Sequence, residues 1–146
     1  MLSQTVEYAL RTCVHLALHT ASSRTTDEVA ESTRVPRAYL SKIIQSLARA
    51  ELVNTQRGVG GGITLSRKPS DITLLHVINA VEPFNRIKEC PLGLPMHGTQ
   101  LCALHRRLDH ALATVESAFG KTTLAELVYE QAMPAPLCIL PIRRRA

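Results

Sequence analysis

The fold is decided by one stretch, residues 25–65, which reads TTDEVAESTRVPRAYLSKIIQSLARAELVNTQRGVGGGITL. Thr25 and Glu28 have the spacing of a capping box, which opens a short helix. After a three-residue turn, Pro36 suits the first turn of a second helix that ends near Ala50. Two short helices, a turn and a glycine-tipped β-hairpin are typical of a winged helix-turn-helix.

The second helix has one apolar face, and a hairpin follows it. The apolar residues recur at steps of three and four, which predicts the buried face, and they are Leu40, Ile43, Ile44 and Leu47. Strand residues from Leu52 lead to a tip at residues 57–62, and residues 63–65 return as the second strand. Four of the five residues at 58–62 are glycine, which we interpret not as a packing device but as bare backbone that approaches DNA closely. A nucleotide-binding loop is disfavoured, because it needs Gly-Lys-Ser/Thr at the start of a helix.

Positive charge is concentrated in the same part of the chain. Residues 34–68 contain seven arginines or lysines and one acid, a charge of +6, whereas the whole 146-residue chain carries +5. A charged face opposite an apolar one is usually only solvated, but its position directly after a helix–turn favours contact with phosphate. Aromatic residues make up only 3% of the chain, so we expect double-stranded rather than single-stranded DNA as the partner.

We therefore predict that the second helix enters the major groove, where Arg and Lys read guanine. The hairpin is expected to contact phosphate or the minor groove. The residues predicted to contact DNA are Arg37, Ala38, Tyr39, Ser41, Lys42, Gln45, Arg49, Arg57, Gly58, Gly60 and Gly61.

Helices are also expected on both sides of this stretch. Periodicity predicts an amphipathic helix at residues 3–19 and a mostly buried one at 72–81. A connecting segment, residues 85–101, is followed by a long helix at 102–119 with Gly120 as its C-cap. We predict that its apolar stripe forms a homodimer with a second copy, the alternative being packing against the chain's own first helix. The stripe comprises Leu104, Leu108, Ala111, Leu112, Val115 and Phe119.

The end of the chain completes the predicted organisation. Thr123 and Glu126 form a second capping box, which opens a final helix to about Gln131. The expected fold is mainly α with a small β-hairpin wing, a winged helix-turn-helix plus a long dimerisation helix. The predicted division is a DNA-binding domain (1–84), a connecting loop (85–101), dimerisation and C-terminal helices (102–132) and a flexible tail (133–146).

Composition and motifs disfavour membrane, secreted and enzymatic classes. No stretch is apolar enough to span a membrane and no signal peptide is recognisable, so we expect a cytoplasmic protein. No nucleophile–base pair or paired carboxylates occupy a recognisable scaffold, so we do not expect an enzyme. In a reducing compartment the four cysteines are more plausible as metal or redox groups than as disulfides.

The chain resembles the Rrf-two family of bacterial winged-helix transcriptional regulators over about residues 1–130, through VEYALR, VPRAYLSKIIQSLARAELV, RGVGGGITL and TLAELV. The resemblance implies a DNA-binding regulator, in the first instance a repressor, that forms a homodimer with the long helix crossing its partner. One departure is Glu51, where the family usually has glycine after the recognition helix.

The resemblance also implies a site in the connecting segment. In the cluster-binding members three cysteines there hold an iron–sulfur cluster; Cys90 and Cys102 match the first and third, and His105 matches a following histidine. Met96 occupies the middle position, and Glu7 matches a carboxylate ligand from the other subunit. What is implied is a two-iron iron–sulfur cluster with mixed ligands that senses redox, iron–sulfur or nitric-oxide status. The alternatives are a zinc site, or a cluster-free regulator controlled by a protein partner or by thiol oxidation.

Overall fold

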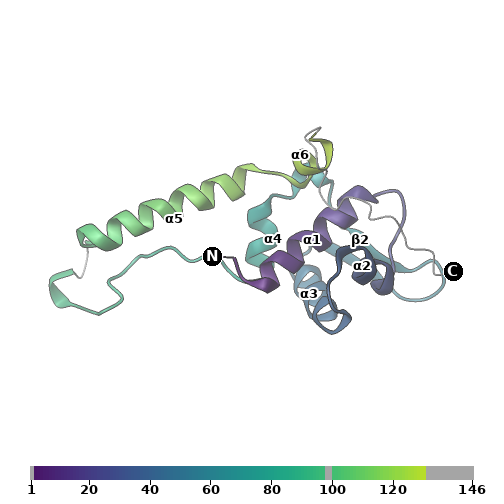
Figure 1. The fold of residues 1–146 in the computed structure, drawn as a ribbon, viewed down its shortest axis with the longest axis horizontal. Helices are drawn as coiled ribbons and strands as arrows, with labels where there is room; N and C mark the ends of the chain where they lie inside the picture. The colour runs from purple at the N-terminus through teal and green to yellow at the C-terminus, as the bar shows by residue number, and fades with distance from the viewer. Residues whose placement is uncertain (1, 98–99, 131–146) are drawn as a thin grey trace.

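The computed structural model describes residues 2–97 and 100–130 and has the predicted architecture, mainly helical with one two-stranded antiparallel hairpin (Figure 1). The elements are α1 (Gln4–Leu18), α2 (Thr26–Thr33), α3 (Arg37–Arg49), β1 (Val53–Gln56), β2 (Gly62–Leu65), η1 (Pro69–Asp71), α4 (Leu74–Val81), η2 (Pro95–His97), α5 (Ala103–Lys121) and α6 (Leu124–Tyr129). Across the described ranges, no helix is long and apolar enough to cross a membrane.

Side-chain caps begin the helices where the sequence predicted them. The Glu28 N–H donates to Thr25 Oγ1 at 3.2 Å, and the Thr25 N–H donates to Glu28 Oε2 at 2.7 Å. Thr123 and Glu126 repeat this reciprocal pair at the start of α6. Each box satisfies N–H groups that a helix start leaves without an intrahelical partner. Both predicted capping boxes are therefore confirmed.

The core forms around α1, which packs against α2, α3, α4 and α6. The apolar face predicted for α3 is confirmed, because Leu40, Ile43, Ile44 and Leu47 are all buried. From the other elements, Val29, Leu52 and Leu124 are also buried in this core. Burial of such aliphatic side chains holds α3 against α1, so the polar face of α3 is left toward solvent.

The C-terminus of α3 ends in a left-handed turn at Glu51, whose φ is 57°. The Leu52 N–H donates to the Leu47 carbonyl at 3.0 Å, and the Glu51 N–H donates to the Ala48 carbonyl at 3.0 Å. This pair of bonds is a Schellman motif, in which glycine usually occupies the left-handed position. The turn leads the chain from α3 directly into the wing.

The wing has a third backbone segment beside its two strands. In the β1–β2 hairpin Val53 pairs with Leu65 and Gln56 with Gly62. Arg24 then bridges to Ile63 on the other side of β2: its N–H donates to the Ile63 carbonyl at 3.0 Å, and its carbonyl accepts from Ile63 at 2.7 Å. The segment before α2 therefore anchors the base of the wing.

Helix α5 extends beyond the core (Figure 1), and its C-terminus returns to it through a backbone bridge. The Leu74 N–H donates to the Thr122 carbonyl and the Leu124 N–H donates to the Ile72 carbonyl, both at 2.9 Å. The prediction that Gly120 caps this helix is wrong. Gly120 lies inside α5, which ends at Lys121 with Thr122 as its C-cap, and a Cβ on Gly120 would sit at an ordinary van der Waals distance of 3.5 Å from Leu75 Cδ2.

Candidate nucleic-acid interface and cysteine segment

The outer face of α3 is open to solvent. Every residue that the sequence analysis placed on it is exposed: Arg37, Ala38, Tyr39, Ser41, Lys42, Gln45 and Arg49. The Arg37 guanidinium forms an ion pair with Asp27 of α2 at 2.9 Å, with both side chains about 70% exposed. An exposed pair of this kind is worth little, so Arg37 is available to another anion.

Tyr39 is held at the start of α3 by residues of α1 that the sequence analysis did not single out. Its ring meets the Tyr8 ring edge to face, with centroids 6.1 Å apart and planes at 67°. The Arg11 guanidinium lies 5.6 Å from the centre of the Tyr8 ring and pairs with Glu7 at 3.0 Å. Aromatic pairs and cation–π contacts favour these arrangements. The Tyr8–Tyr39 contact joins residues far apart in the sequence, so no local pattern could reveal it.

The glycines of the wing tip are required by the tip itself. A Cβ on Gly61 would lie 2.3 Å from the Gln56 carbonyl oxygen, and a Cβ on Gly62 would lie 2.7 Å from the Arg24 carbonyl oxygen. The interpretation that these glycines are not a packing device is therefore wrong for Gly61 and Gly62. The Ser23 hydroxyl also holds the tip, because it donates to the carbonyl of Gly60 at 3.3 Å or of Gly61 at 3.2 Å.

The remaining residues predicted on the wing face outward. Arg57, Gly58 and Gly60 are exposed, and Gly61 is half-buried. Val59, between two glycines at the tip, is fully exposed. The wing and the outer face of α3 therefore present cationic side chains and accessible backbone, the groups that duplex DNA selects.

The cysteine segment contains two thiol–imidazole pairs. The backbone N–H of Leu94, the His97 imidazole and the N–H of Leu92 all lower the pKa of the Cys90 thiol below its ordinary value. Further along, Cys102 Sγ lies 3.4 Å from His105 Nδ1. Cys102 and His105 are thus brought together as predicted.

Within one chain, no third predicted ligand is placed beside this pair. In the part of the chain that the structure describes, no group of three or more His, Cys, Asp or Glu side chains is placed to hold a metal ion. Cys90 lies in its own turn, and Glu7 lies on α1, paired with Arg11. Cys13 is buried in the core, and burial raises its pKa to about 12.

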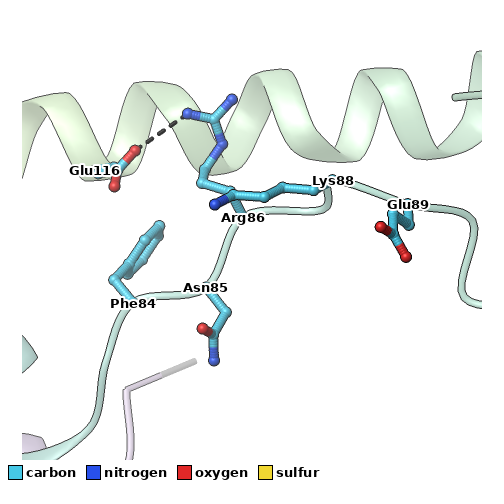
Figure 2. Close-up of a pocket in the computed structure, with 6 residues that line it drawn as sticks. All are labelled: Phe84, Asn85, Arg86, Lys88, Glu89 and Glu116. Carbon is cyan, nitrogen blue, oxygen red and sulfur yellow. Dashed lines mark hydrogen bonds and ion pairs between the residues drawn. The ribbon is translucent and has the colours of Figure 1, made fainter. Parts of the chain in front are cut away.

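An arginine of the connecting segment, missed by the sequence analysis, fastens that segment to α5 (Figure 2). Arg86 donates from Nε and Nη2 to the two oxygens of Asp109, each at 2.7 Å. Its Nη1 donates to Glu116 at 3.1 Å, and the N–H of Ile87 donates to Asp109 Oδ1 at 3.0 Å. The hydrogen bonds from Arg86 lower the pKa of Asp109. We call these four residues the Arg86 clamp. Asp109 and Glu116 are seven apart on α5, which was the only signal in the sequence.

The apolar stripe of α5 is largely uncovered. Leu104 is 62% exposed and Leu108 48% exposed. Leu112, Val115 and Phe119 are half-buried and Ala111 is exposed, so no residue of α5 is fully buried. The helix packs mainly against α4 rather than α1, and Phe119 meets Phe84 edge to face at 6.3 Å. A contiguous exposed apolar stripe is a feature typical of a protein–protein contact surface.

Comparison with known proteins gives consistent matches over almost the whole chain. A model of the Rrf2 family, described as "Iron-dependent Transcriptional regulator", matches residues 2–130. The HTH-type transcriptional regulator NsrR of Geobacillus kaustophilus is 30% identical over 137 residues, which cover 90% of this chain and 91% of that protein.

Two solved structures share the fold. CymR, the global cysteine regulator of B. subtilis, has a TM-score of 0.73 at 23% identity, with 87% of this chain and 95% of that chain covered. IscR of T. potens has a TM-score of 0.73 at 23% identity, with 87% of this chain and 85% of that chain covered. At this identity the likeness establishes the winged-helix fold and its long helix.

Proposed function

Because this chain belongs to the Rrf2 family and is therefore a DNA-binding transcriptional regulator rather than an enzyme, we propose that it acts in the cytoplasm as a homodimeric repressor. The protein binds duplex DNA through α3 and the wing. The state of its cysteine segment controls that binding. The observation that carries the proposal is the exposed basic face of α3 beside a wing with an exposed, glycine-rich tip.

In the proposed complex α3 enters the major groove. Lys42 and Gln45 lie on the exposed face of the helix, where they reach base edges, and Arg57 lies at the base of the wing tip, where it reaches phosphate. The uncovered stripe of α5 supports a dimer, which matches paired half-sites on the DNA.

DNA binding is tested by gel shift with Lys42→Ala and Arg57→Ala on fragments that the protein selects from its own genome. We expect Lys42→Ala to weaken binding by about 1–3 kcal/mol, the value of a base-edge contact. Arg57→Ala should weaken binding to all sequences and reduce the salt slope by about one. Lys121→Ala, at the end of α5, is the matched control and should bind normally. Unchanged affinity in both variants would contradict the proposed interface.

The dimer is tested separately by sedimentation. Leu108→Glu places a charge in the exposed stripe of α5 and should shift the protein toward monomer. Thr114→Glu introduces the same charge at an exposed position of the same helix outside the stripe, and the dimer should persist. If both variants sediment like the wild type, the α5 stripe is not the dimer contact.

The donor set of the cysteine segment fits a mixed thiolate–imidazole site and not a three-thiolate one. Met96 stands in the middle position, and a thioether is a poor ligand for iron. His97, whose imidazole lowers the pKa of the Cys90 thiol, is a second imidazole of the segment, and its Nδ1 is buried with no hydrogen-bond partner among the described residues. Cys90, Cys102 and His105 would hold the group, either a two-iron cluster or zinc. When bound, a two-iron cluster would supply one-electron redox sensitivity.

The cofactor is tested by anaerobic purification, a visible spectrum, and iron, sulfide and zinc assays. Bound iron with sulfide, or bound zinc, that is lost in Cys90→Ser and Cys102→Ser would support the proposed site. A colourless, metal-free protein whose DNA affinity changes on thiol oxidation would favour the cluster-free alternative. Two observations support that alternative: Met96 in the middle position, and the separation of the two thiol–imidazole pairs. Control by a protein partner would be indicated by co-purification of that partner.

A further inference from the structure

The Arg86 clamp is stronger than an ordinary surface ion pair. The Asp109 carboxylate accepts three hydrogen bonds, two from the Arg86 guanidinium and one from the Ile87 N–H. The Arg86 and Asp109 side chains are only 31% and 19% exposed, and Glu116 takes a further guanidinium N–H. A bidentate, partly buried ion pair contributes binding energy and also fixes the relative orientation of its two groups, whereas an exposed single contact contributes little of either. The clamp therefore defines where the connecting segment begins along α5.

The clamp lies at about the same distance along the chain from Cys90 as it does along α5 from Cys102. Ile87 is beside Asp109, and Cys90 follows three residues later, which is at most about 10 Å of chain. Cys102 precedes Asp109 by seven residues, which is about 10 Å of helix. In Figure 1 the connecting segment runs from the clamp toward the N-terminal end of α5. The stretch from Ile87 to Cys90 and the stretch of α5 from Asp109 back to Cys102 therefore run in the same direction. Cys90 can thus come level with Cys102 along the axis of α5.

The relevant groups also share one side of the helix. Cys102, His105 and Asp109 have the spacing i, i+3 and i+7, which places them in one row. Cys102 and His105 are in contact at 3.4 Å, which confirms that the row begins at the cysteine. The segment held on Asp109 is therefore directed toward the thiol–imidazole pair.

We propose that Arg86 is a positioning residue: by clamping the connecting segment to Asp109 and Glu116, it sets the register in which Cys90 meets Cys102 and His105 on α5. The inference rests on the proposed function, since it assumes that these residues form the responsive site. It also gives a route for the response, because the same clamp ties the cysteine segment to the helix that carries the dimer stripe. Cys90 and Cys102 belong to one metal or redox site only while the clamp holds them at the same position along the axis of α5.

The experiment measures how fast the thiols of Cys90 and Cys102 form a disulfide within one chain. The full chain carries Cys138→Ser, because Cys138 lies outside the described residues, and Cys13 stays in place because it is buried. Reduced, metal-free protein is treated with diamide, which oxidises two thiols to one disulfide and takes up their two electrons and two protons to become the hydrazine. The rate of Cys90–Cys102 disulfide formation within one chain is followed by mass spectrometry. It is divided by the rate at which iodoacetamide alkylates each single thiol, so a change in thiol reactivity alone does not alter the ratio.

Four proteins are compared with the Cys138→Ser background. Arg86→Ala removes the clamp. Arg86→Lys keeps the positive charge but cannot form the two parallel hydrogen bonds of the guanidinium. Asp109→Asn removes the negative charge but keeps an oxygen that accepts from the Ile87 N–H. Arg106→Ala removes an exposed arginine of α5 that makes no ion pair within the described ranges. We expect the ratio to fall roughly tenfold or more in Arg86→Ala, because loss of register lowers the effective concentration of one thiol near the other. Arg86→Lys and Asp109→Asn should be intermediate, and Arg106→Ala unchanged.

An equal ratio in Arg86→Ala and the background, or absence of the Cys90–Cys102 disulfide from the background protein, would overturn the inference. If Arg86→Ala loses its folded circular-dichroism signal, Asp109→Asn decides the matter alone. DNA binding by the reduced proteins is measured in parallel and should be the same in all of them. Loss of DNA binding in the background protein would count instead against the proposed function, so the two failures are distinguishable.

Discussion

Replacing Glu51 by glycine should stabilise the protein, although the substitution removes a side chain. Glu51 holds a φ of 57° at the left-handed position of the Schellman turn after α3. For an L-residue this conformation costs roughly 1–2 kcal/mol because Cβ approaches the following carbonyl oxygen. Glycine has no Cβ, so Glu51→Gly removes that cost from the folded state.

The gain is reduced by the unfolded state. Glycine gives the unfolded chain more conformational freedom, which costs about 0.5–1 kcal/mol. The hydrogen bonds of the turn run from backbone N–H groups and the Ser66 hydroxyl to backbone carbonyls, so removing the Glu51 side chain breaks none of them. A net stabilisation of about 0.5–1 kcal/mol is expected, which corresponds to roughly 1–4 °C in melting temperature for a chain of this size.

The assay is urea unfolding at fixed protein concentration, with Glu51→Ala as the matched control. Alanine removes the same charge but keeps a Cβ, so it should leave stability nearly unchanged. The reasoning is refuted if glycine and alanine give the same free energy of unfolding, because the strain at this position would then play no part.

Three further predictions concern other parts of the fold. Leu47→Ala in the core should lower the free energy of unfolding by about 2–5 kcal/mol, measured by urea titration, because the side chain is fully buried and would leave a cavity. Gly61→Ala should weaken DNA binding in gel shifts with little loss of helix signal, because its Cβ would displace the Gln56 carbonyl and reshape the wing tip. Acid should destabilise the protein through His15, since burial first, and then His19 and Arg24, lower its pKa from 6.5 to about 4. The unfolded chain takes up the proton first, so this stability is complete above about pH 6.5 and is lost toward pH 4, at up to about 1.4 kcal/mol per pH unit. His15→Gln should flatten the pH dependence of urea unfolding in that window.

The part of the molecule from α2 to the wing could be predicted closely because its signals are local. A capping box joins residues three apart, and the apolar face of α3 repeats every three or four residues. The residues predicted on α3 are exposed together because burying Leu40 and Leu47 on one side leaves the other side to solvent. The exposed basic face of α3 thus follows from periodicity, charge and turn chemistry.

The cysteine segment could not be predicted in this way. Its residues have no regular period, and Pro and Gly interrupt them. The resemblance placed Cys90, Cys102 and His105 of one chain in one site, whereas among these only Cys102 and His105 are in contact within the described residues. Their pairing follows from i, i+3 spacing at the start of α5, which is again a local relation.

The sequence by itself therefore determined the order of the helices, the capping boxes, the hairpin and the basic face, all of which depend on neighbours a few residues apart. Only the tertiary structure decided why Gly62 is needed and how Arg24 bridges the wing. It also decided that Arg86 clamps the connecting segment to Asp109. Each of these depends on a contact between residues distant in the chain, and such a contact exists only after the hydrophobic core has brought the elements together.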